Sequence, residues 1–197
     1  YVQMAMQVAS YRLFGKVVGT YEALQTRPFL HGRTETARSV STASTAFCEA
    51  MGLTVAMAVD EGALAKKRAL LQTAVDAHSQ YSRMGSNGLG VDRHFFGLSM
   101  LVAEGEAAPD LFSHPLFLRS KRWRMSTSTL PNVAPGFGPV DEDGVGVGYD
   151  LRSESCIFTI TARKQNAYVY RMSDLITEAL EELRALASVE SAPMSRL

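Results

Sequence analysis

The sequence predicts a mixed α/β domain in which strands and helices pack as two layers. Three observations lead to this prediction. The chain has 197 residues, which is enough for one domain with a hydrophobic core. Long segments with apolar residues at helical spacing occur in both halves, and shorter segments with alternating apolar residues lie between them. Strands mixed with long helices are typical of the α/β and α+β layer architectures.

Helical spacing dominates the first part of the chain. Apolar residues recur every three to four positions over residues 2–18, and Gly19 breaks this pattern. Residues 21–29 are expected to run extended until a proline interrupts them. The spacing then predicts helices over residues 41–57 and 62–84. The apolar face of the second of these helices contains Leu64, Leu70, Leu71, Ala74, Val75 and His78.

Turn-forming residues separate the elements in the middle of the chain. Residues 86–90 are a loop by composition, and a helix is expected over residues 93–104. Pro109 and Pro115 bracket a short helix or turn. Alternation predicts a strand over residues 123–129, where it enters a loop.

The last part of the chain combines strands with a closing helix. Residues 141–144 predict a turn between two strand-like runs, 137–140 and 145–151. Alternation predicts a further strand over residues 156–162, and helical spacing predicts an amphipathic helix over residues 168–189. The apolar face of this helix contains Leu175, Ile176, Ala179, Leu180, Leu183 and Leu186.

Composition argues against several kinds of function. The formal net charge is zero, since 20 Lys and Arg balance 20 Asp and Glu, so neither nucleic acid nor an anionic membrane is expected as the main partner. The two cysteines, Cys48 and Cys156, match no metal spacing and no disulfide framework, which favours a reducing compartment. The pattern predicts neither a membrane span nor a secretory signal.

The two ends of the chain lead to further expectations. The chain begins at Tyr1, without an initiator methionine and inside a helical pattern, so we expect a fragment whose upstream part is missing. We predict one domain over residues 1–190 and a flexible tail over residues 191–197. The tail ends in Ser195-Arg196-Leu197, which keeps the small–basic–Leu pattern of the peroxisomal address Ser-Lys-Leu. A chance tripeptide is the alternative.

Four motifs in a fixed order carry a resemblance to a known family. They are the segment 20–39, which contains Thr34-Glu35-Thr36, then Asp92-Arg93-His94, Ser126-Thr127-Ser128 and Phe137-Gly138-Pro139-Val140. In this order they resemble the motifs of the choline/carnitine O-acyltransferase family. Nearly the whole chain is similar to the C-terminal part of these enzymes, and within the family it most resembles the carnitine acetyltransferases. The resemblance implies the two-layer fold of CoA-dependent acyltransferases, related to chloramphenicol acetyltransferase. It also implies an active site between two such domains.

The residues Tyr21, Thr34 and Arg93 form the first candidate site. An arginine fork with nearby hydroxyl groups can bind a carboxylate. From the residues alone, an ordinary ion pair between Arg93 and Asp92 or Glu35 is the alternative. The resemblance implies that Tyr21, Thr34 and Arg93 bind the carboxylate of carnitine. Choline has no carboxylate, and the choline acetyltransferases differ over the stretch matching residues 34–36 and carry Asn in place of Arg93.

The resemblance also implies roles for three residues further along the chain. The hydroxyl of Ser126 would lie beside the carnitine carboxylate, and Ser128 would donate a hydrogen bond to the oxyanion of the tetrahedral intermediate. The ring of Phe137 would face the trimethylammonium group of carnitine through a cation–π contact. Without the resemblance, these residues are a common Ser-Thr-Ser loop and a core aromatic residue in a turn.

The general base of the family is not among the residues of this chain. The resemblance implies a histidine in a His-x-x-x-Asp setting, and none of His31, His78, His94 and His114 has Asp four positions on. This histidine and the Lys-rich CoA segment belong to an upstream part of the family's chain. We expect His78 and His94 to be structural, satisfied by neighbours in helices.

Several positions depart from the family pattern. Ala23 stands where members commonly carry Ser, and Ser79 stands where some relatives use Arg near CoA. Thr129 is a candidate CoA-binding residue, although it replaces a Gln that contacts CoA in acetyl-transferring relatives. Pro135 and Gly136 lie where short-chain enzymes place a bulky residue that closes the acyl tunnel, which leaves the acyl length open.

The resemblance therefore implies a carnitine O-acyltransferase that moves an acyl group reversibly between acyl-CoA and L-carnitine, with a short acyl group such as acetyl favoured. No metal and no cofactor besides the CoA substrate are implied. The expected partners are the two substrates, the missing N-terminal part of the enzyme and, through the tail, a peroxisomal import receptor. The expected location is the peroxisome, with the mitochondrion as a second. The alternatives are a medium- or long-chain carnitine acyltransferase and an inactive carnitine- or acyl-CoA-binding protein.

Overall fold

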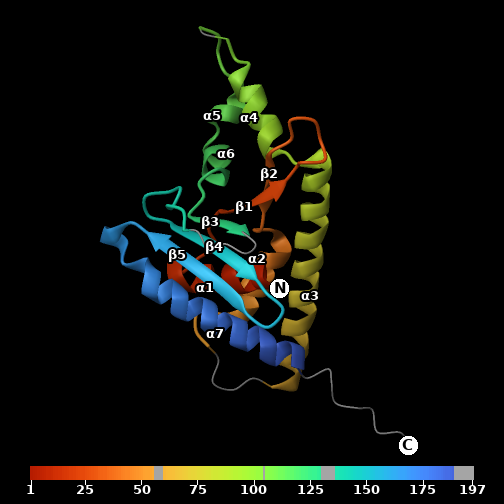
Figure 1. Ribbon diagram of the computed structural model, residues 1–197, viewed down its shortest axis with the longest axis vertical. Coiled ribbons are helices and arrows are strands. Elements are labelled where there is room, and N and C mark those ends of the chain that lie inside the picture. Colours follow the sequence, from red (N-terminus) through yellow and green to blue (C-terminus); the bar gives the residue numbers. More distant parts are fainter. Residues whose placement is uncertain (56–59, 104, 130–135, 189–197) are drawn as a thin grey trace, which may run out of the picture.

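A computed structural model describes residues 1–55, 60–103, 105–129 and 136–188. Its centre is a sheet of five strands in the order β2-β1-β3-β4-β5, with long helices packed against one face (Figure 1). The β1–β3 and β3–β4 pairs are parallel, while β1–β2 and β4–β5 are antiparallel. The predicted mixed α/β fold of helices layered on a sheet is confirmed, and it fits the CoA-dependent acyltransferase fold.

Helix α1 (Val2–Phe14) lies at the centre of the helical layer. Its residues from Gln3 to Ser10 are all buried, as expected for a helix covered on every side. Gly15 ends the helix in the left-handed conformation with φ at 68°, four residues before the predicted break. Gly19 has a different role, because a Cβ there would overlap the carbonyl oxygen of Arg122 on the neighbouring segment.

Two apolar clusters meet on α1 and hold the layers together. One cluster joins α1 to α2 (Thr42–Met51), α3 (Glu61–Met84) and α7 (Tyr168–Ser188), around the fully buried Phe47 and Leu183. The other joins α1 and α7 to strands β3 (Met125–Thr129) and β4 (Val145–Leu151), around Met125 and Val147. The core therefore lies between the sheet and α1, and again between α1 and the outer helices.

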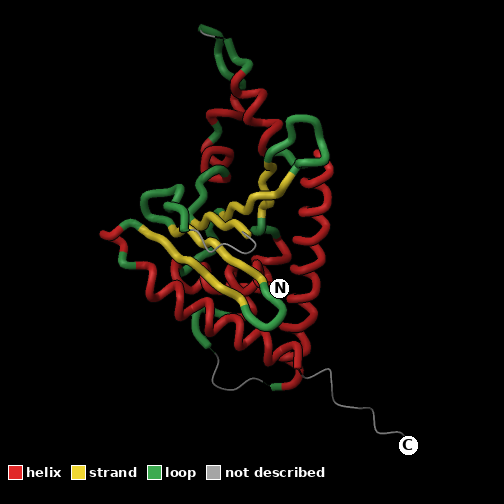
Figure 2. The backbone as a smooth tube through the Cα atoms, in the orientation of Figure 1, coloured by secondary structure: helices red, strands yellow, loops and turns green. Residues whose placement is uncertain are grey.

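Strands β1 (Thr20–Gln25) and β2 (Thr34–Arg38) form the hairpin at one edge of the sheet (Figure 2). The extended segment predicted from residue 21 is confirmed only as far as Gln25, because residues 26–33 turn back through hydrogen bonds such as Thr26 N–H to Arg33 O, 3.1 Å. Strand β2 was not predicted. It places Thr34 and Arg38 on one face of the sheet.

The remaining predicted helices are confirmed, α3 to within one residue and the helices predicted over 41–57 and 93–104 with earlier ends. The predicted helix 41–57 is α2, which Ser41 and Ser44 begin with a reciprocal capping box and which ends before Gly52. Helix α3 continues into a kinked turn at Gly85–Leu89, where Gly88 has a φ of 79°. Helix α4 (Asp92–Met100) and the short helices α5 (Asp110–Ser113) and α6 (Pro115–Ser120) then project away from the sheet (Figure 1).

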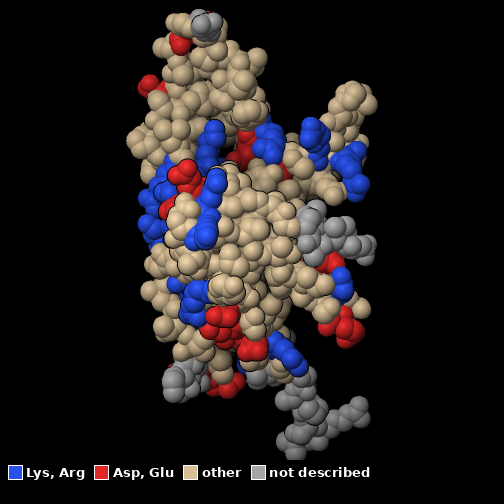
Figure 3. All heavy atoms as spheres, turned by 60° about the vertical axis from the view of Figure 1, so that its left-hand side comes forward, with Lys and Arg blue, Asp and Glu red and all other residues tan. Residues whose placement is uncertain are grey.

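The base of this projection is rich in positive charge. Figure 3 shows Lys and Arg gathered where the mostly uncharged projection joins the body of the molecule. A hollow of about 500 Å³ lies there, beneath α6. Its lining includes Lys16, Arg38, Arg119, Arg122 and Arg124.

The strand predicted over residues 137–140 is wrong. Strand β4 is already paired on one side with β3 and on the other with β5 (Cys156–Ala162), so no edge is free for a further strand. Pro139 also lacks the N–H that a ladder requires. The strands at 145–151 and 156–162 and the closing helix are confirmed. None of the described helices is long and apolar enough to cross a membrane. The predicted tail, residues 191–197, lies outside the described residues.

Candidate functional site

The face of the sheet opposite the helices carries the candidate residues. Strand pairing aligns Arg38, Tyr21, Ser126, Gly146 and Thr161 as one row across all five strands. Residues opposite one another in paired strands point to the same face. Ser128 lies two residues further along β3, so its side chain points to this face as well. The polar row therefore lies on the open face, and the apolar residues of the same strands lie against the helices.

Tyr21, Thr34 and Arg93 converge at the edge of this face, as the sequence predicts. Nη2 of Arg93 donates to the hydroxyl of Tyr21 at 3.2 Å and to Oγ1 of Thr34 at 3.3 Å. Nε of Arg93 donates to the carbonyl oxygen of Thr34 at 3.1 Å. The guanidinium group is thus held by a strand backbone and two hydroxyl groups, and its side chain is exposed to solvent.

The ion-pair alternative for Arg93 is wrong. Asp92 pairs instead with Arg38, through two bonds of 2.6 and 2.9 Å. The carboxylate of Glu35 accepts from the backbone N–H of Arg93 and not from its guanidinium. Among the described residues, no ion pair includes Arg93. Its charge is therefore available to an external anion.

The Ser-Thr-Ser motif forms most of strand β3. Ser126 is buried and Ser128 is half-buried, both on the open face. Thr127 points the other way. Its hydroxyl donates to the carbonyl oxygen of Tyr21 at 2.9 Å and accepts from Nε2 of Gln3 at 3.1 Å. Thr127 therefore ties β3 to β1 and fixes the positions of Ser126 and Ser128 along the strand relative to Tyr21.

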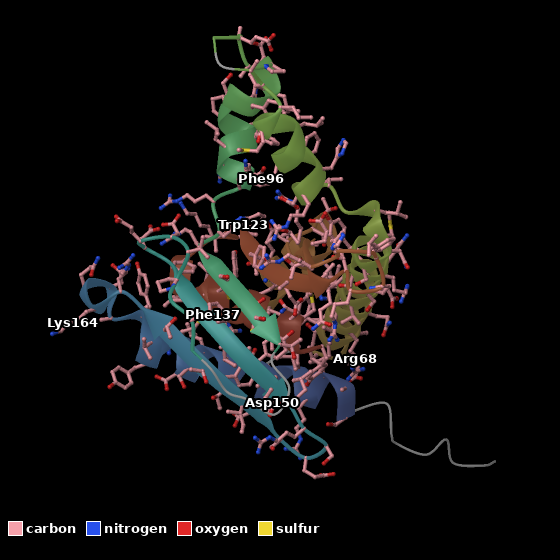
Figure 4. All side chains as sticks on the ribbon, turned by 45° about the horizontal axis from the view of Figure 1, so that its top comes forward. Arg68, Phe96, Trp123, Phe137, Asp150 and Lys164 are labelled. Atoms are coloured by element: carbon pink, nitrogen blue, oxygen red, sulfur yellow. The ribbon has the colours of Figure 1, made fainter. Side chains whose placement is uncertain are left out.

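Phe137, which is labelled in Figure 4, lies over Gly146 of strand β4, and Gly146 is paired with Ser126. The carbonyl oxygen of Phe137 accepts a hydrogen bond from Oγ1 of Thr161, which fixes the segment across β4 and β5. Gly146 leaves room for it, because a Cβ at that position would lie 2.6 Å from the carbonyl oxygen and 3.3 Å from Cδ2 of Phe137. The ring, the serine hydroxyl and the arginine fork therefore follow one another across the sheet.

Trp123 and Arg38 are site neighbours that sequence reasoning missed. The ring of Trp123 packs edge-on against Tyr21, with centroids 5.9 Å apart, and the guanidinium carbon of Arg38 lies 4.7 Å from the centroid of the Trp123 ring. Predicting β2 as a strand would have found Arg38, because the hairpin register places it opposite Tyr21.

A buried polar network beneath the row was also missed. Glu22 on β1 accepts from the hydroxyl of Tyr149 on β4, and Gln3 on α1 donates to Tyr149 at 3.3 Å. Nε2 of His78 lies 3.5 Å from Oε2 of Glu22. Burial raises the pKa of Glu22 and lowers the pKa of His78, so both shifts oppose the charged forms.

Among the described residues, no hydrogen bond or ion pair joins any of the four histidines to a candidate site residue. His78 is held by a strand residue and not by helix neighbours as expected, and its buried Nδ1 has no hydrogen-bond partner among the described residues. His94 is exposed on α4. His114 accepts from the N–H of Leu116 and so caps α6. His31 occupies a turn with φ at 59°.

The positions that depart from the family pattern are only partly described. Thr129 is exposed at the end of β3, opposite Tyr149. Ser79 is half-buried on α3, and Ala23 lies on β1 two residues after Tyr21. Gly136 is exposed, and Pro135 lies outside the described residues. Of the two positions at the expected acyl tunnel, the structure therefore describes Gly136.

Comparisons with known proteins agree with the motifs. The family model described as Choline/Carnitine o-acyltransferase matches residues 1–178. The mitochondrial carnitine O-acetyltransferase of Saccharomyces cerevisiae is 35% identical over 93% of this chain and 27% of its own length. The muscle isoform of human carnitine O-palmitoyltransferase 1 is 35% identical over 98% of this chain and 26% of its own. The choline O-acetyltransferase of Rattus norvegicus is 33% identical over 95% of this chain and 30% of its own.

These relatives name different substrates, so identity alone does not separate carnitine from choline or acetyl from palmitoyl. The chain spans less than a third of the length of each of them. The family match covers most of the chain and includes all four motifs. The chain belongs to the choline/carnitine O-acyltransferase family.

Proposed function

We propose that this chain carries the carnitine-binding part of a carnitine O-acyltransferase, which transfers an acyl group reversibly between acyl-CoA and L-carnitine. One observation carries the proposal. The guanidinium of Arg93 is exposed, oriented by Tyr21 and Thr34, and outside every ion pair among the described residues. An arginine fork held in this way can take the carboxylate of a zwitterionic substrate.

The row across the sheet fits the two ends of carnitine. Its carboxylate would lie at Arg93 and the hydroxyls of Tyr21, Thr34 and Ser126, while its trimethylammonium group would lie against the ring of Phe137. Neighbouring strands are about 4.8 Å apart, so a short zwitterion can reach from β1 toward β4. Opposite charges would then meet complementary groups at the two ends of the row.

Ser128 is suited to the reacting end of the substrate. It lies roughly 6.6 Å along β3 from Ser126, since each strand residue advances about 3.3 Å. The hydroxyl of carnitine would attack the thioester carbonyl of acyl-CoA, and its proton would pass to a histidine contributed by another part of the protein. Ser128 would donate to the resulting oxyanion, and the carbon–sulfur bond would then break to release CoA. Thr129 follows directly and is the candidate contact to CoA.

Arg93 favours carnitine over choline. A choline enzyme would gain nothing from the fork, because choline has no carboxylate, and a bound choline would leave the guanidinium of Arg93 without an anionic partner. In the full-length protein, we expect Arg93→Asn to raise the KM for carnitine at least tenfold. Steady-state kinetics with carnitine and choline test this, and an unchanged KM would remove Arg93 from the site.

Acetyl is the acyl group that we propose, since carnitine O-acetyltransferases from yeast, pigeon and human align with most or all of this chain. The human palmitoyltransferase at a similar identity keeps a long acyl group as the second candidate. Parallel assays with acetyl-, octanoyl- and palmitoyl-CoA distinguish them. Carnitine binding without turnover of any of the three would instead indicate an inactive binding protein.

We propose the peroxisome as the location, on the basis of Ser195-Arg196-Leu197. A fluorescent protein that ends in residues 191–197 should enter peroxisomes, and the same fusion without the last three residues should not. The yeast relative is named as mitochondrial, so the full-length protein should be followed in the same cells.

A further inference from the structure

The position of Arg93 depends on how helix α4 begins. Arg93 is the second residue of this helix, and its N-cap residue, Val91, has no side chain that can accept a hydrogen bond from the first turn. The structure supplies an acceptor from the neighbouring strand instead. The Glu35 carboxylate accepts from the backbone N–H of Arg93 at 3.3 and 3.4 Å, and Oε1 accepts from the N–H of Thr36 at 2.6 Å.

This arrangement is favourable because a negative charge at the N-terminus of a helix complements its dipole. Glu35 is only 6% exposed, so solvent screens this interaction weakly. The chain also makes room for it. A Cβ at Gly90 would lie 2.5 Å from Cδ and 2.7 Å from Oε2 of Glu35, so any larger residue would displace the carboxylate.

A second contact holds the same helix end from Arg38. Its guanidinium makes the two bonds to Asp92, the residue before Arg93, and donates through Nη1 to the carbonyl oxygen of Ser120 at 2.8 Å. It also packs over Trp123, whose ring lies against Tyr21. Arg38 therefore contacts Asp92, which precedes Arg93, and Trp123, which packs against Tyr21.

We propose that Glu35 and Arg38 are positioning residues for the carnitine carboxylate, acting through Arg93. Among the described residues, no hydrogen bond or ion pair joins either side chain to the guanidinium of Arg93, so they act by fixing the start of α4 beside β2. Strand β2 thus carries Thr34, which contacts the guanidinium of Arg93, and also the two residues that we propose to position Arg93. This inference rests on the proposed function.

The test uses the full-length protein with Glu35→Gln and Arg38→Gln. We expect the KM for carnitine to rise at least fivefold, with the KM for acyl-CoA and kcat at saturating carnitine within twofold of wild type. Glu49→Gln is the matched control, because Glu49 is exposed on α2, and its constants should not change. Losses of similar size in all three constants would indicate a merely structural role and overturn the proposal.

Double variants separate positioning from general damage. In the Arg93→Asn background, Glu35→Gln should change the carnitine KM less than twofold, because the group that it positions is gone. A full fivefold effect in that background would overturn the proposal. If Glu35→Gln does not give folded protein, Glu35→Asp keeps the charge but shortens the reach by one methylene, and the same pattern of KM values is expected.

The proposed function and the positioning role fail in different ways. If Arg93→Asn leaves the carnitine KM unchanged, the carnitine site itself is wrong. If Arg93→Asn raises the KM while Glu35→Gln and Arg38→Gln do not, only the positioning role is wrong.

Discussion

Serine hydroxyls two residues apart on β3 have different neighbours and should have separable effects. Ser126 lies in the row with Tyr21, whereas Ser128 lies further along the strand, toward the residue that would contact CoA. A hydroxyl that meets the substrate carboxylate acts in both ground state and transition state, while a hydroxyl that meets an oxyanion acts only in the transition state.

We therefore expect Ser128→Ala to lower kcat by about 10²- to 10³-fold with little change in the carnitine KM, since loss of one oxyanion donor typically has this effect. Ser126→Ala should instead raise the carnitine KM and change kcat little. Steady-state kinetics of both variants of the full-length protein check the prediction. An equal loss of kcat in the two would contradict separate roles.

Site residues that belong to a family motif could be predicted from the sequence, but the residues that hold them in place could not. Tyr21, Thr34 and Arg93 come together as expected. Arg38 was missed, and Glu35 was considered only as an ion-pair partner of Arg93, because charged residues that hold other residues leave no pattern of their own in one sequence. His78 was expected to be satisfied within the helices, but its partner is Glu22, far away in the sequence and on a strand.

At the scale of elements, the long helices and the edge strand β5 were predictable, but the other edge strand, β2, was not. Residues 62–84 have an apolar face long enough to predict α3 almost to the residue. Strand β2 reads Thr-Glu-Thr-Ala-Arg and contains one apolar residue, Ala37, so the alternation of apolar residues that predicts a strand is absent although three of its five residues are buried. The run 137–140 reads as a strand locally, but the sheet has no free edge beside β4, which is a fact of topology that local spacing does not contain.

The close approach of Phe137 to Gly146 on strand β4 leads to a prediction about that glycine. Gly146→Ala would place a Cβ 2.6 Å from the carbonyl oxygen of Phe137 and 2.7 Å from Oγ1 of Thr161, so the segment that contains Phe137 must move. We expect a higher carnitine KM in the full-length protein, because the ring of Phe137 shifts. Gly97→Ala is the matched control, since nothing lies within 4 Å of its Cβ, and it should leave the KM unchanged. An unaltered KM in Gly146→Ala would mean that Phe137 does not contact carnitine.

At the scale of the whole molecule, one buried polar network joins the sheet to the helical layer. Gln3 on α1 contacts Thr127 and Tyr149, and it accepts from the hydroxyl of Ser39 at 3.0 Å. Glu22 joins this group to His78 on α3. A network of this kind fixes the sheet relative to the helices, and with it the row on the open face, because a slip would leave buried polar groups without partners.

The same network makes stability depend on pH through Glu22. Burial raises its pKa above the usual 4.5, so the folded protein holds this proton more tightly than the unfolded chain does. The contribution is then fully present below about pH 4.5 and is lost as the pH rises through the higher pKa of the folded state. His78, whose pKa is lowered, gives the opposite trend, with stability lost as the pH falls from 6.5 through its folded-state pKa.

Glu22→Gln isolates the carboxylate, because an amide can still accept from the hydroxyl of Tyr149 but does not titrate. The variant should therefore gain thermal stability relative to wild type as the pH rises above 4.5, and the gain should level off once wild-type Glu22 is fully ionised. Midpoints of thermal unfolding of the full-length protein between pH 4.5 and 8 measure this difference, with Glu49→Gln as the exposed control. A difference that does not change with pH would show that Glu22 titrates alike in the folded and unfolded states, which would contradict its shielding from solvent in the folded protein.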